Sequence, residues 1–146
     1  MSPGSLKRYS LLAEFSEEER EALAELLEER SIPNGKSVFR EGSEAEGLVL
    51  LESGRLKLKS RRTGGVVGSI EAPQHLGAVS LFAFGKREVT ALADSPCKVW
   101  ILPRASIARL LDDAPRAAYQ LAAATAGELA GLMRTGLDCL VEADLE

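Results

Sequence analysis

Long apolar segments are missing from this sequence of 146 residues. No apolar run approaches the roughly 20 residues that a membrane-spanning helix needs. The opening residues, MSPGSLKRYS, also lack the apolar core of a secretory signal peptide. Both absences predict a cytoplasmic protein that does not enter a membrane.

Cysteine and histidine are scarce. The two cysteines, Cys97 and Cys139, are too few and too far apart for a disulfide framework. With His75 as the one histidine, no zinc site can be assembled. We expect both cysteines to be reduced and to act as small buried hydrophobic side chains. His75 has no catalytic partner in the sequence, so we expect it to have a structural role.

Catalytic motifs are also missing. The sequence has no motif of paired catalytic carboxylates, no nucleophile elbow and no spacing typical of metal ligands. These absences predict a protein that is not an enzyme, with no catalytic residue, no metal and no required cofactor.

Positive charge is not in excess, because 18 Lys and Arg stand against 22 Asp and Glu. Nucleic-acid binders draw much of their affinity from Lys and Arg that neutralise phosphates, so direct nucleic-acid binding is not expected. Arg55, Lys57 and Lys59 do form one basic stripe. They alternate with Leu56 and Leu58, a pattern typical of a strand with leucines facing inward and cations facing water.

The overall composition is that of a globular protein, with 45% hydrophobic and 27% charged residues, enough for one domain over residues 1–146. Ser16 and Glu19 have the spacing of a capping box, which predicts a helix start. The apolar residues Leu23, Leu26 and Leu27 then follow at helical spacing. We therefore expect an N-terminal helix within about residues 11–30, ending near Arg30.

Short β-rich runs separated by turn residues occupy about residues 31–102. The turn signals are Pro33-Asn34-Gly35, Glu41-Gly42-Ser43, Ser53-Gly54, Gly64-Gly65 and Gly85-Lys86. This pattern predicts a small antiparallel sandwich or barrel, with its last strands at Val89–Ala93 and Lys98–Leu102.

Residues 103–142 return to helical patterns. Pro103 and Arg104 predict a short helix to about Leu111, and Pro115 begins a long helix that runs to about Glu142. Small and apolar side chains follow one another at heptad-like spacing along this helix: Ala122, Thr125, Leu129, Leu132, Gly136 and Cys139. Such a stripe predicts packing against a partner, either a second copy of the chain or an unidentified effector protein.

The order of these elements resembles that of the cyclic-nucleotide-binding domain. Short segments also match, namely Phe15-Ser16-Glu17-Glu18-Glu19, Val38-Phe39-Arg40-Glu41-Gly42 and Ser53-Gly54-Arg55-Leu56. The resemblance covers nearly the whole chain and implies an α+β fold. It implies an antiparallel, jelly-roll-like β-roll of about eight strands, an N-terminal helix, a short helix in the phosphate-binding cassette and a long C-terminal helix.

The resemblance is to the sensor half of bacterial catabolite-activator and Fnr-type regulators and to the kinase regulatory subunit. In the bacterial regulators a helix-turn-helix follows the long helix. The sequence ends at Glu146 without one, so we expect no DNA-binding domain and no direct control of transcription by these residues alone.

The phosphate-binding cassette of that family reads aromatic, Gly, Glu, apolar, small, Leu, and then a loop that ends in Arg. The matching residues here are Leu76, Gly77, Ala78, Val79, Ser80 and Leu81, followed after the loop by Arg87, Glu88 and Val89. The spacing implies that Arg87 grips the cyclic phosphate, and a guanidinium fork suits two phosphate oxygens. Backbone amides from Ala78 to Leu81, at the start of the short helix, would add partial positive charge.

Two cassette positions depart from the family. Ala78 replaces the glutamate that accepts the ribose 2′-hydroxyl, which removes a hydrogen bond worth about 1.5–3 kcal/mol and predicts a weaker ligand. Glu88 replaces a small residue, and its carboxylate would repel the phosphate or pair with Arg87. The alternative interpretation of Arg87 is therefore a surface residue, ion-paired with Glu88 or with an acid on the long helix.

In the family the base packs against the long helix, which acts as a lid and as the dimer seam. Leu129, Leu132 and Met133 occupy that region here, and they also suit core or dimer packing. They offer no hydrogen bond that would distinguish cAMP from cGMP.

The sequence therefore predicts a non-enzymatic regulatory module. It would hold a cyclic nucleotide, cAMP or cGMP, weakly or atypically and signal through its C-terminal helix. The alternative is a ligand-free domain that acts in protein–protein interaction or dimerisation.

Overall fold

Strands β3 (Gly47–Ser53) and β8 (Cys97–Pro103) lie at the centre of the fold, and most of their side chains are buried. In the computed structural model, which describes residues 1–145, the side chains of β3 alternate between two cores. Leu48 and Leu50 pack with the helices, whereas Val49 and Leu51 face the interior between the sheets. This position between two layers explains the continuous apolar run of β3.

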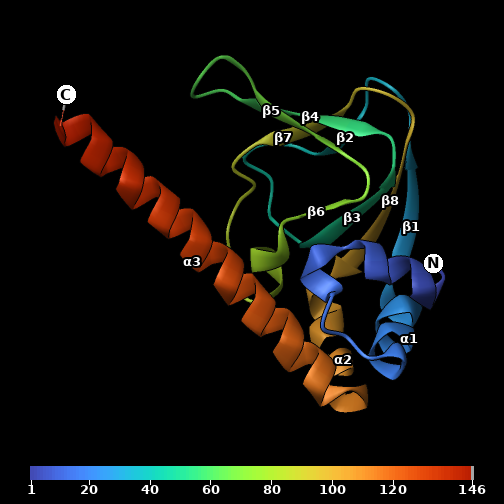
Figure 1. Ribbon diagram of the computed structural model, residues 1–146. Coiled ribbons are helices and arrows are strands. Elements are labelled where there is room, and N and C mark those ends of the chain that lie inside the picture. Colours follow the sequence, from blue (N-terminus) through green and yellow to red (C-terminus); the bar gives the residue numbers. More distant parts are fainter. Residues whose placement is uncertain (146) are drawn as a thin grey trace.

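Eight antiparallel strands form two four-stranded sheets, with the orders β1-β8-β3-β6 and β2-β7-β4-β5. The other strands are β1 (Glu28–Ile32), β2 (Ser37–Phe39), β4 (Arg55–Ser60), β5 (Gly65–Glu71), β6 (Gln74–Leu76) and β7 (Thr90–Ala93). Together with the helices, this arrangement confirms the predicted α+β fold with a β-roll of about eight strands (Figure 1).

The alternation predicted in β4 is also confirmed. Leu56 is fully buried between the sheets, and Leu58 packs against the same core. On the outer face, Arg55 and Lys57 form ion pairs with Asp94, at 2.9 and 3.1 Å. The basic stripe thus lies on a solvated strand face.

The helices gather on one side of the roll, next to the sheet that contains β3 and β8 (Figure 1). They are the 3₁₀ turns η1 (Pro3–Arg8), η2 (Ser10–Leu12), η3 (Ala78–Leu81) and η4 (Arg104–Ser106), and the α-helices α1 (Glu17–Leu26), α2 (Ile107–Asp113) and α3 (Pro115–Leu145). The short helix predicted after Pro103 is therefore η4 followed by α2. Within residues 1–145, none of these helices is long and apolar enough to span a bilayer.

The capping box at the start of α1 is confirmed. The amide of Glu19 donates to Ser16 Oγ at 3.2 Å, and the amide of Ser16 donates to Glu19 Oε1 at 3.2 Å. Burial raises the pKa of Glu19, but hydrogen bonds from Ser16 and Arg116 outweigh burial and hold that pKa below its ordinary value. Because Arg116 lies on α3, the same carboxylate ties the first α-helix to the last.

The prediction that the N-terminal helix runs to about Arg30 is wrong. α1 ends at Leu26, and the chain is extended from Glu28. In β1, Glu28 lies opposite Ile101 and Arg30 lies opposite Val99 of β8. Pairing with a central strand thus outweighs the local helical preference of this charged segment.

Helix α3 packs on the body only through its first part. Ala117, Ala118, Leu121 and Thr125 are buried, whereas every side chain from residue 131 to 144 is exposed. Figure 1 shows this end of α3 extending away from the strands. Cys139 lies there, so the prediction that it is buried is wrong, while Cys97 is buried as predicted.

Candidate functional site

The cassette turn begins at Gly77, directly after β6. Gly77 has φ of +75°, as the predicted glycine turn requires, and the short helix η3 follows it. A second constraint also excludes a side chain here. A Cβ at this position would overlap Nη1 of Arg87 and lie 3.2 Å from the Gly47 carbonyl oxygen. Gly77 therefore supplies both the turn and the space in which the Arg87 guanidinium lies.

The Arg87 guanidinium is half-buried and fixed on two sides. Its Nη2 donates to the carbonyl oxygen of Gly47 at 2.9 Å, and its Cζ lies 4.2 Å from the centroid of the Phe39 ring. Its Nε is buried and has no hydrogen-bond partner within residues 1–145. Burial lowers the pKa of Arg87 and the Glu46 carboxylate partly offsets this, but a guanidinium still stays charged at neutral pH. The chain thus holds a cation with an unused donor.

The backbone of Arg87 is held as firmly as its side chain. Its amide donates to the carbonyl of Ser43 at 2.8 Å, and its carbonyl accepts from the amide of Gly42 at 2.9 Å. Gly42 has φ of +84° in the turn between β2 and β3. The Arg87 position is therefore set by a turn more than 40 residues earlier in the sequence.

Ser80 fastens η3 to β3. Its hydroxyl lies 2.8 Å from the Gly47 carbonyl oxygen and 2.7 Å from the Gly77 carbonyl oxygen, and it can donate to either. Its amide donates to the Gly77 carbonyl at 3.0 Å. The Ser80 amide thus donates within the turn and is not free to donate to a ligand. At least one of the backbone amides predicted to face a phosphate, from Ala78 to Leu81, is therefore not available to it.

A cavity of about 480 Å³ opens beside Arg87. It lies between the cassette and α3, and its walls are mainly apolar. Its lining residues are Phe39, Ala45, Leu76, Gly77, Val79, Ser80, Ala83, Phe84, Gly85, Lys86, Arg87, Glu88, Val89 and Leu129. A larger hollow of about 550 Å³, beside Lys36 on the outer face of the other sheet, contains none of the predicted site residues.

Several predicted site residues line this cavity and others do not. Gly77, Val79, Ser80, Arg87, Glu88, Val89 and Leu129 come together around it. Leu132 and Met133 are exposed further along α3 and are not among its lining residues. Leu81 and Ala78 belong to the core next to the helices.

The orientation of Ala78 differs from the prediction that it faces a ribose. Its side chain is 3% exposed and packs in the helix-side core, while the neighbouring Val79 lines the cavity. The 3₁₀ turn that starts at Gly77 sets this alternation. The Ala78 methyl group therefore does not line the cavity.

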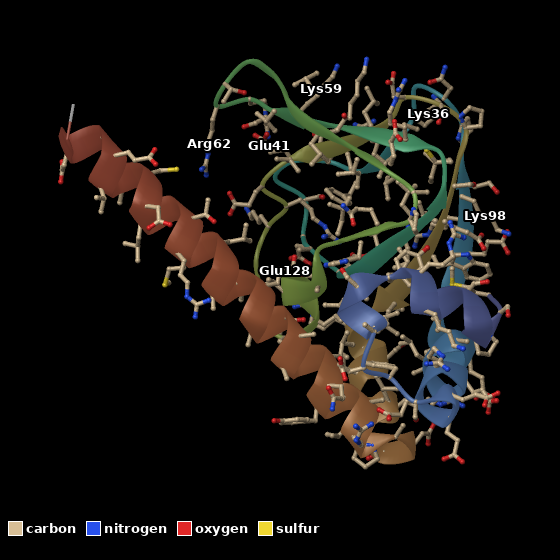
Figure 2. The ribbon with its side chains drawn as sticks, in the orientation of Figure 1. Lys36, Glu41, Lys59, Arg62, Lys98 and Glu128 are labelled. Carbon is tan, nitrogen blue, oxygen red and sulfur yellow. The ribbon has the colours of Figure 1, made fainter. Side chains whose placement is uncertain are left out.

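Glu88 does not pair with Arg87. Its carboxylate lies 3.6 Å from the guanidinium of Arg62, and both side chains are exposed. Figure 2 shows Arg62 at the tip of the β4-β5 hairpin. An exposed pair of this kind contributes little to stability. The alternative interpretation of Arg87 as a surface residue paired with an acid is therefore wrong, and its charge remains free of a carboxylate contact within 4 Å among residues 1–145.

Helix α3 touches the cassette through a polar contact. His75 Nε2, on β6, lies 2.7 Å from Glu128 Oε2 on α3. Figure 2 labels Glu128 on this helix. The next residue, Leu129, lines the cavity. His75 thus has the structural role that the sequence predicts, and it joins the strand before Gly77 to the long helix.

Sequence reasoning missed Gly47 and Phe39 as supports of Arg87. Phe39 lies within a segment that resembles the family, yet its position under the guanidinium depends on how the two sheets pack. Gly47 opens β3, where a Cβ would overlap the Leu102 carbonyl and lie 3.0 Å from Pro103 Cα. A glycine before an apolar run is the one local signal that the sequence offers. Among the described residues, no group of three potential ligands gathers as a metal site.

Comparison with known proteins gives consistent matches. The profile of the family described as "Cyclic nucleotide-binding domain" matches residues 29–114, more than half of the chain. A curated relative, the "cAMP-dependent protein kinase regulatory subunit" of Yarrowia lipolytica, is 30% identical over 111 residues, which are 76% of this chain and 30% of that protein. The chain thus spans about a third of that relative's length.

Two solved structures resemble the chain over most of its length. One is the N-terminal domain of a transcriptional regulator from Streptomyces coelicolor, with a TM-score of 0.79, 25% identity, and coverage of 88% of this chain and 94% of that one. The other is the catabolite activator protein of Thermus thermophilus, with a TM-score of 0.76, 26% identity, and coverage of 96% of this chain and 63% of that one.

We expect Gly77→Ala to lower the free energy of unfolding more than Gly64→Ala. Both glycines have φ of +75°, so an added Cβ brings a similar backbone strain of about 1–2 kcal/mol. At Gly64 the Cβ meets nothing within 4 Å, whereas at Gly77 it displaces the Arg87 guanidinium. Loss of the hydrogen bond from Arg87 to Gly47 should cost about 1 kcal/mol more. Urea denaturation of the two variants measures this difference.

The same pair of substitutions in an Arg87→Ala background provides the control. There the excess loss at position 77 should shrink, because the guanidinium is already absent and only the 3.2 Å approach of the Cβ to the Gly47 carbonyl oxygen remains. An excess loss at position 77 as large as in the parent background would contradict the assignment of the space beside Gly77 to Arg87.

Proposed function

The chain belongs to the cyclic nucleotide-binding domain family, and we propose that within it this chain is a non-enzymatic regulatory module that binds cAMP or cGMP at the cassette. The observation that carries the proposal is the Arg87 guanidinium. It is half-buried, bears an unpartnered Nε and lines a cavity of about 480 Å³. The Y. lipolytica relative, a cAMP-dependent protein kinase regulatory subunit by name, supports this class of ligand.

The chemistry of a cyclic phosphate suits this site. A 3′,5′-cyclic phosphate carries one negative charge and two free oxygens, which match the parallel N–H donors of one guanidinium. A buried N–H without a partner costs about 1–3 kcal/mol, and a phosphate oxygen would recover that cost if the guanidinium turned its Nε toward the cavity. Glu88 pairs with Arg62 and therefore does not compete with the phosphate for Arg87. The Glu46 carboxylate acts on Arg87 through its charge and forms no ion pair with it.

We propose that the ribose is held less tightly than in relatives that have a glutamate at the position of Ala78. Ala78 is buried in the helix-side core, and the apolar Val79 takes its place in the cavity wall. A hydrogen bond to a charged group is worth about 1.5–3 kcal/mol, which corresponds to roughly 10- to 150-fold in affinity. The affinity of this chain for a cyclic nucleotide should be lower by about that factor.

We propose that α3 transmits ligand binding. The His75–Glu128 contact ties α3 to the strand that leads into Gly77, and Leu129 forms part of the cavity wall. A ligand that packs against Leu129 would therefore have different affinities for different positions of the helix. Such a difference is the requirement for a ligand to shift the population of conformations.

Arg87→Ala should weaken the binding of cAMP and of cGMP by at least about tenfold, because charge-assisted hydrogen bonds of about 1.5–3 kcal/mol are lost. Isothermal titration calorimetry with each nucleotide measures the effect. Arg109→Ala is the matched control, since it removes one exposed guanidinium from α2, where Arg109 pairs with Asp113. Equal affinity of the parent chain and Arg87→Ala would exclude Arg87 as the phosphate ligand.

We further propose that two copies of the chain associate through α3. Large apolar side chains remain exposed along its last turns, namely Leu129, Leu132, Met133, Leu137, Leu140 and Val141. Exposed apolar surface of this extent is typical of an interface, and Leu129 and Leu132 continue the heptad-like stripe. The same face supports the alternative function, an interaction module that binds no nucleotide.

Leu132→Glu should convert a dimer of the parent chain into a monomer, because it places two like charges within the apolar seam. Sedimentation equilibrium measures the change. Arg134→Glu is the control, because it adds the same carboxylate to the same helix away from that stripe and should remain dimeric. A parent chain that sediments as a monomer throughout the concentration range would contradict the proposed dimer.

A further inference from the structure

Phe84 is the most exposed large apolar side chain among the described residues, with 92% of its surface accessible. It lies in the loop between η3 and β7 and lines the same cavity as Arg87. Its ring is accessible to a ligand in that cavity, and an accessible aromatic ring is a surface on which a nucleotide base can stack. We propose that the Phe84 ring is the surface on which the base of the bound nucleotide stacks. This inference rests on the proposed function.

The ring is supported from behind by a second arginine. Cζ of Arg104 lies 4.2 Å from the centroid of the Phe84 ring, a cation–π contact. Arg104 is itself fixed, because its Nη2 donates to the Ala45 carbonyl at 2.9 Å and its amide donates to the Glu46 carbonyl at 2.7 Å. The Arg104 guanidinium therefore covers one face of the Phe84 ring, and the other face is accessible to a ligand.

The backbone beside Phe84 is held in place as well. The Gly85 carbonyl accepts from the Ala45 amide at 2.9 Å, and Lys86 forms an isolated β-bridge with Glu44. Arg87 follows immediately and is pinned to Ser43. The ring and the phosphate-binding guanidinium thus lie on one short segment that is fastened to the same turn.

No other aromatic side chain among residues 1–145 offers an open face to this cavity. Phe39 lines it, but its ring is covered by the Arg87 guanidinium. Tyr9, Phe15 and Trp100 are buried in the helix-side core. Phe82 and Tyr119 do not line the cavity. A base bound next to Arg87 would therefore find its aromatic partner in Phe84.

Leu129 completes the proposed base site. It reaches the cavity from α3, whereas Phe84 reaches it from the cassette loop. An aromatic ring and an aliphatic side chain bury both faces of a planar base without reading its edge. Purines present a larger stacking surface than pyrimidines, so the site should favour purine cyclic nucleotides and should distinguish adenine from guanine only weakly.

Calorimetric titration of the folded chain with cAMP and with the abasic ribose 3′,5′-cyclic phosphate tests this inference. Phe84→Ala should weaken cAMP binding by about 5- to 150-fold, the factor expected for the loss of one base–aromatic stack. It should leave binding of the abasic compound unchanged. Tyr119→Ala, which removes an exposed aromatic ring outside the cavity, is the matched control and should bind both compounds as the parent does.

A second variant gives an optical readout. In Phe84→Trp, cAMP should quench the fluorescence of the new tryptophan, because its base would stack on the indole ring. The abasic compound has no base and should leave this fluorescence unchanged. The buried Trp100 supplies a constant background in both titrations.

The outcomes separate the base site from the proposed function. If the parent and Phe84→Ala bind cAMP with equal affinity, while Arg87→Ala loses it, the function stands and the stacking role of Phe84 is overturned. If Phe84→Ala weakens cAMP and the abasic compound alike, the ring supports the cassette and does not bind the base. If the parent binds neither compound, both proposals fail.

Discussion

The hydrogen bond from the Arg87 side chain to the Gly47 carbonyl is the interaction on which the rest of the site depends. Gly77 must lack a side chain because the guanidinium lies against it, and Ser80 shares the same carbonyl oxygen. Gly47 must lack one because the strand next to it approaches too closely for a Cβ. The Gly47 carbonyl thus joins Arg87 and Ser80, and the Arg87 contact links segments that are 40 residues apart.

That contact has consequences for ligand chemistry. With Nη2 on a backbone carbonyl and Nε without a partner, the guanidinium is held in position yet incompletely satisfied. A polar group in this state can gain an anion at little cost in side-chain entropy, because its rotamer is already selected. The missing carboxylate at position 78 acts in the opposite direction. Together they support the proposal of a site that contacts the phosphate through Arg87 and uses apolar and aromatic contacts for the remainder of the ligand.

The sequence predicts those features that are encoded by local patterns. The capping box at Ser16, the alternation in β4, the glycine turn at Gly77 and the long helix after Pro115 all depend on residues a few positions apart. The family resemblance adds the eight-stranded roll and the spacing from Gly77 to Arg87. The strand at Glu28–Ile32 could not be predicted in this way, because its β conformation depends on pairing with β8, about 70 residues away in the chain.

The details of the site depend on packing that the pattern does not contain. Ala78 packs in the helix-side core, whereas the next residue of the same 3₁₀ turn, Val79, lines the cavity. Cys139 is exposed because α3 leaves the body beyond Leu129, which still lines the cavity. An apolar stripe on a helix predicts that the stripe is buried. The same stripe results whether the helix packs against the core of its own chain or against a partner, so the sequence does not distinguish the two.

A crystal structure of the chain grown with saturating cAMP tests the central claim most directly. The account predicts the cyclic phosphate within hydrogen-bond distance of the Arg87 guanidinium, beside Gly77, in the cavity between the cassette and α3. A nucleotide bound elsewhere on the chain, or one that leaves Arg87 without a phosphate contact, would contradict it.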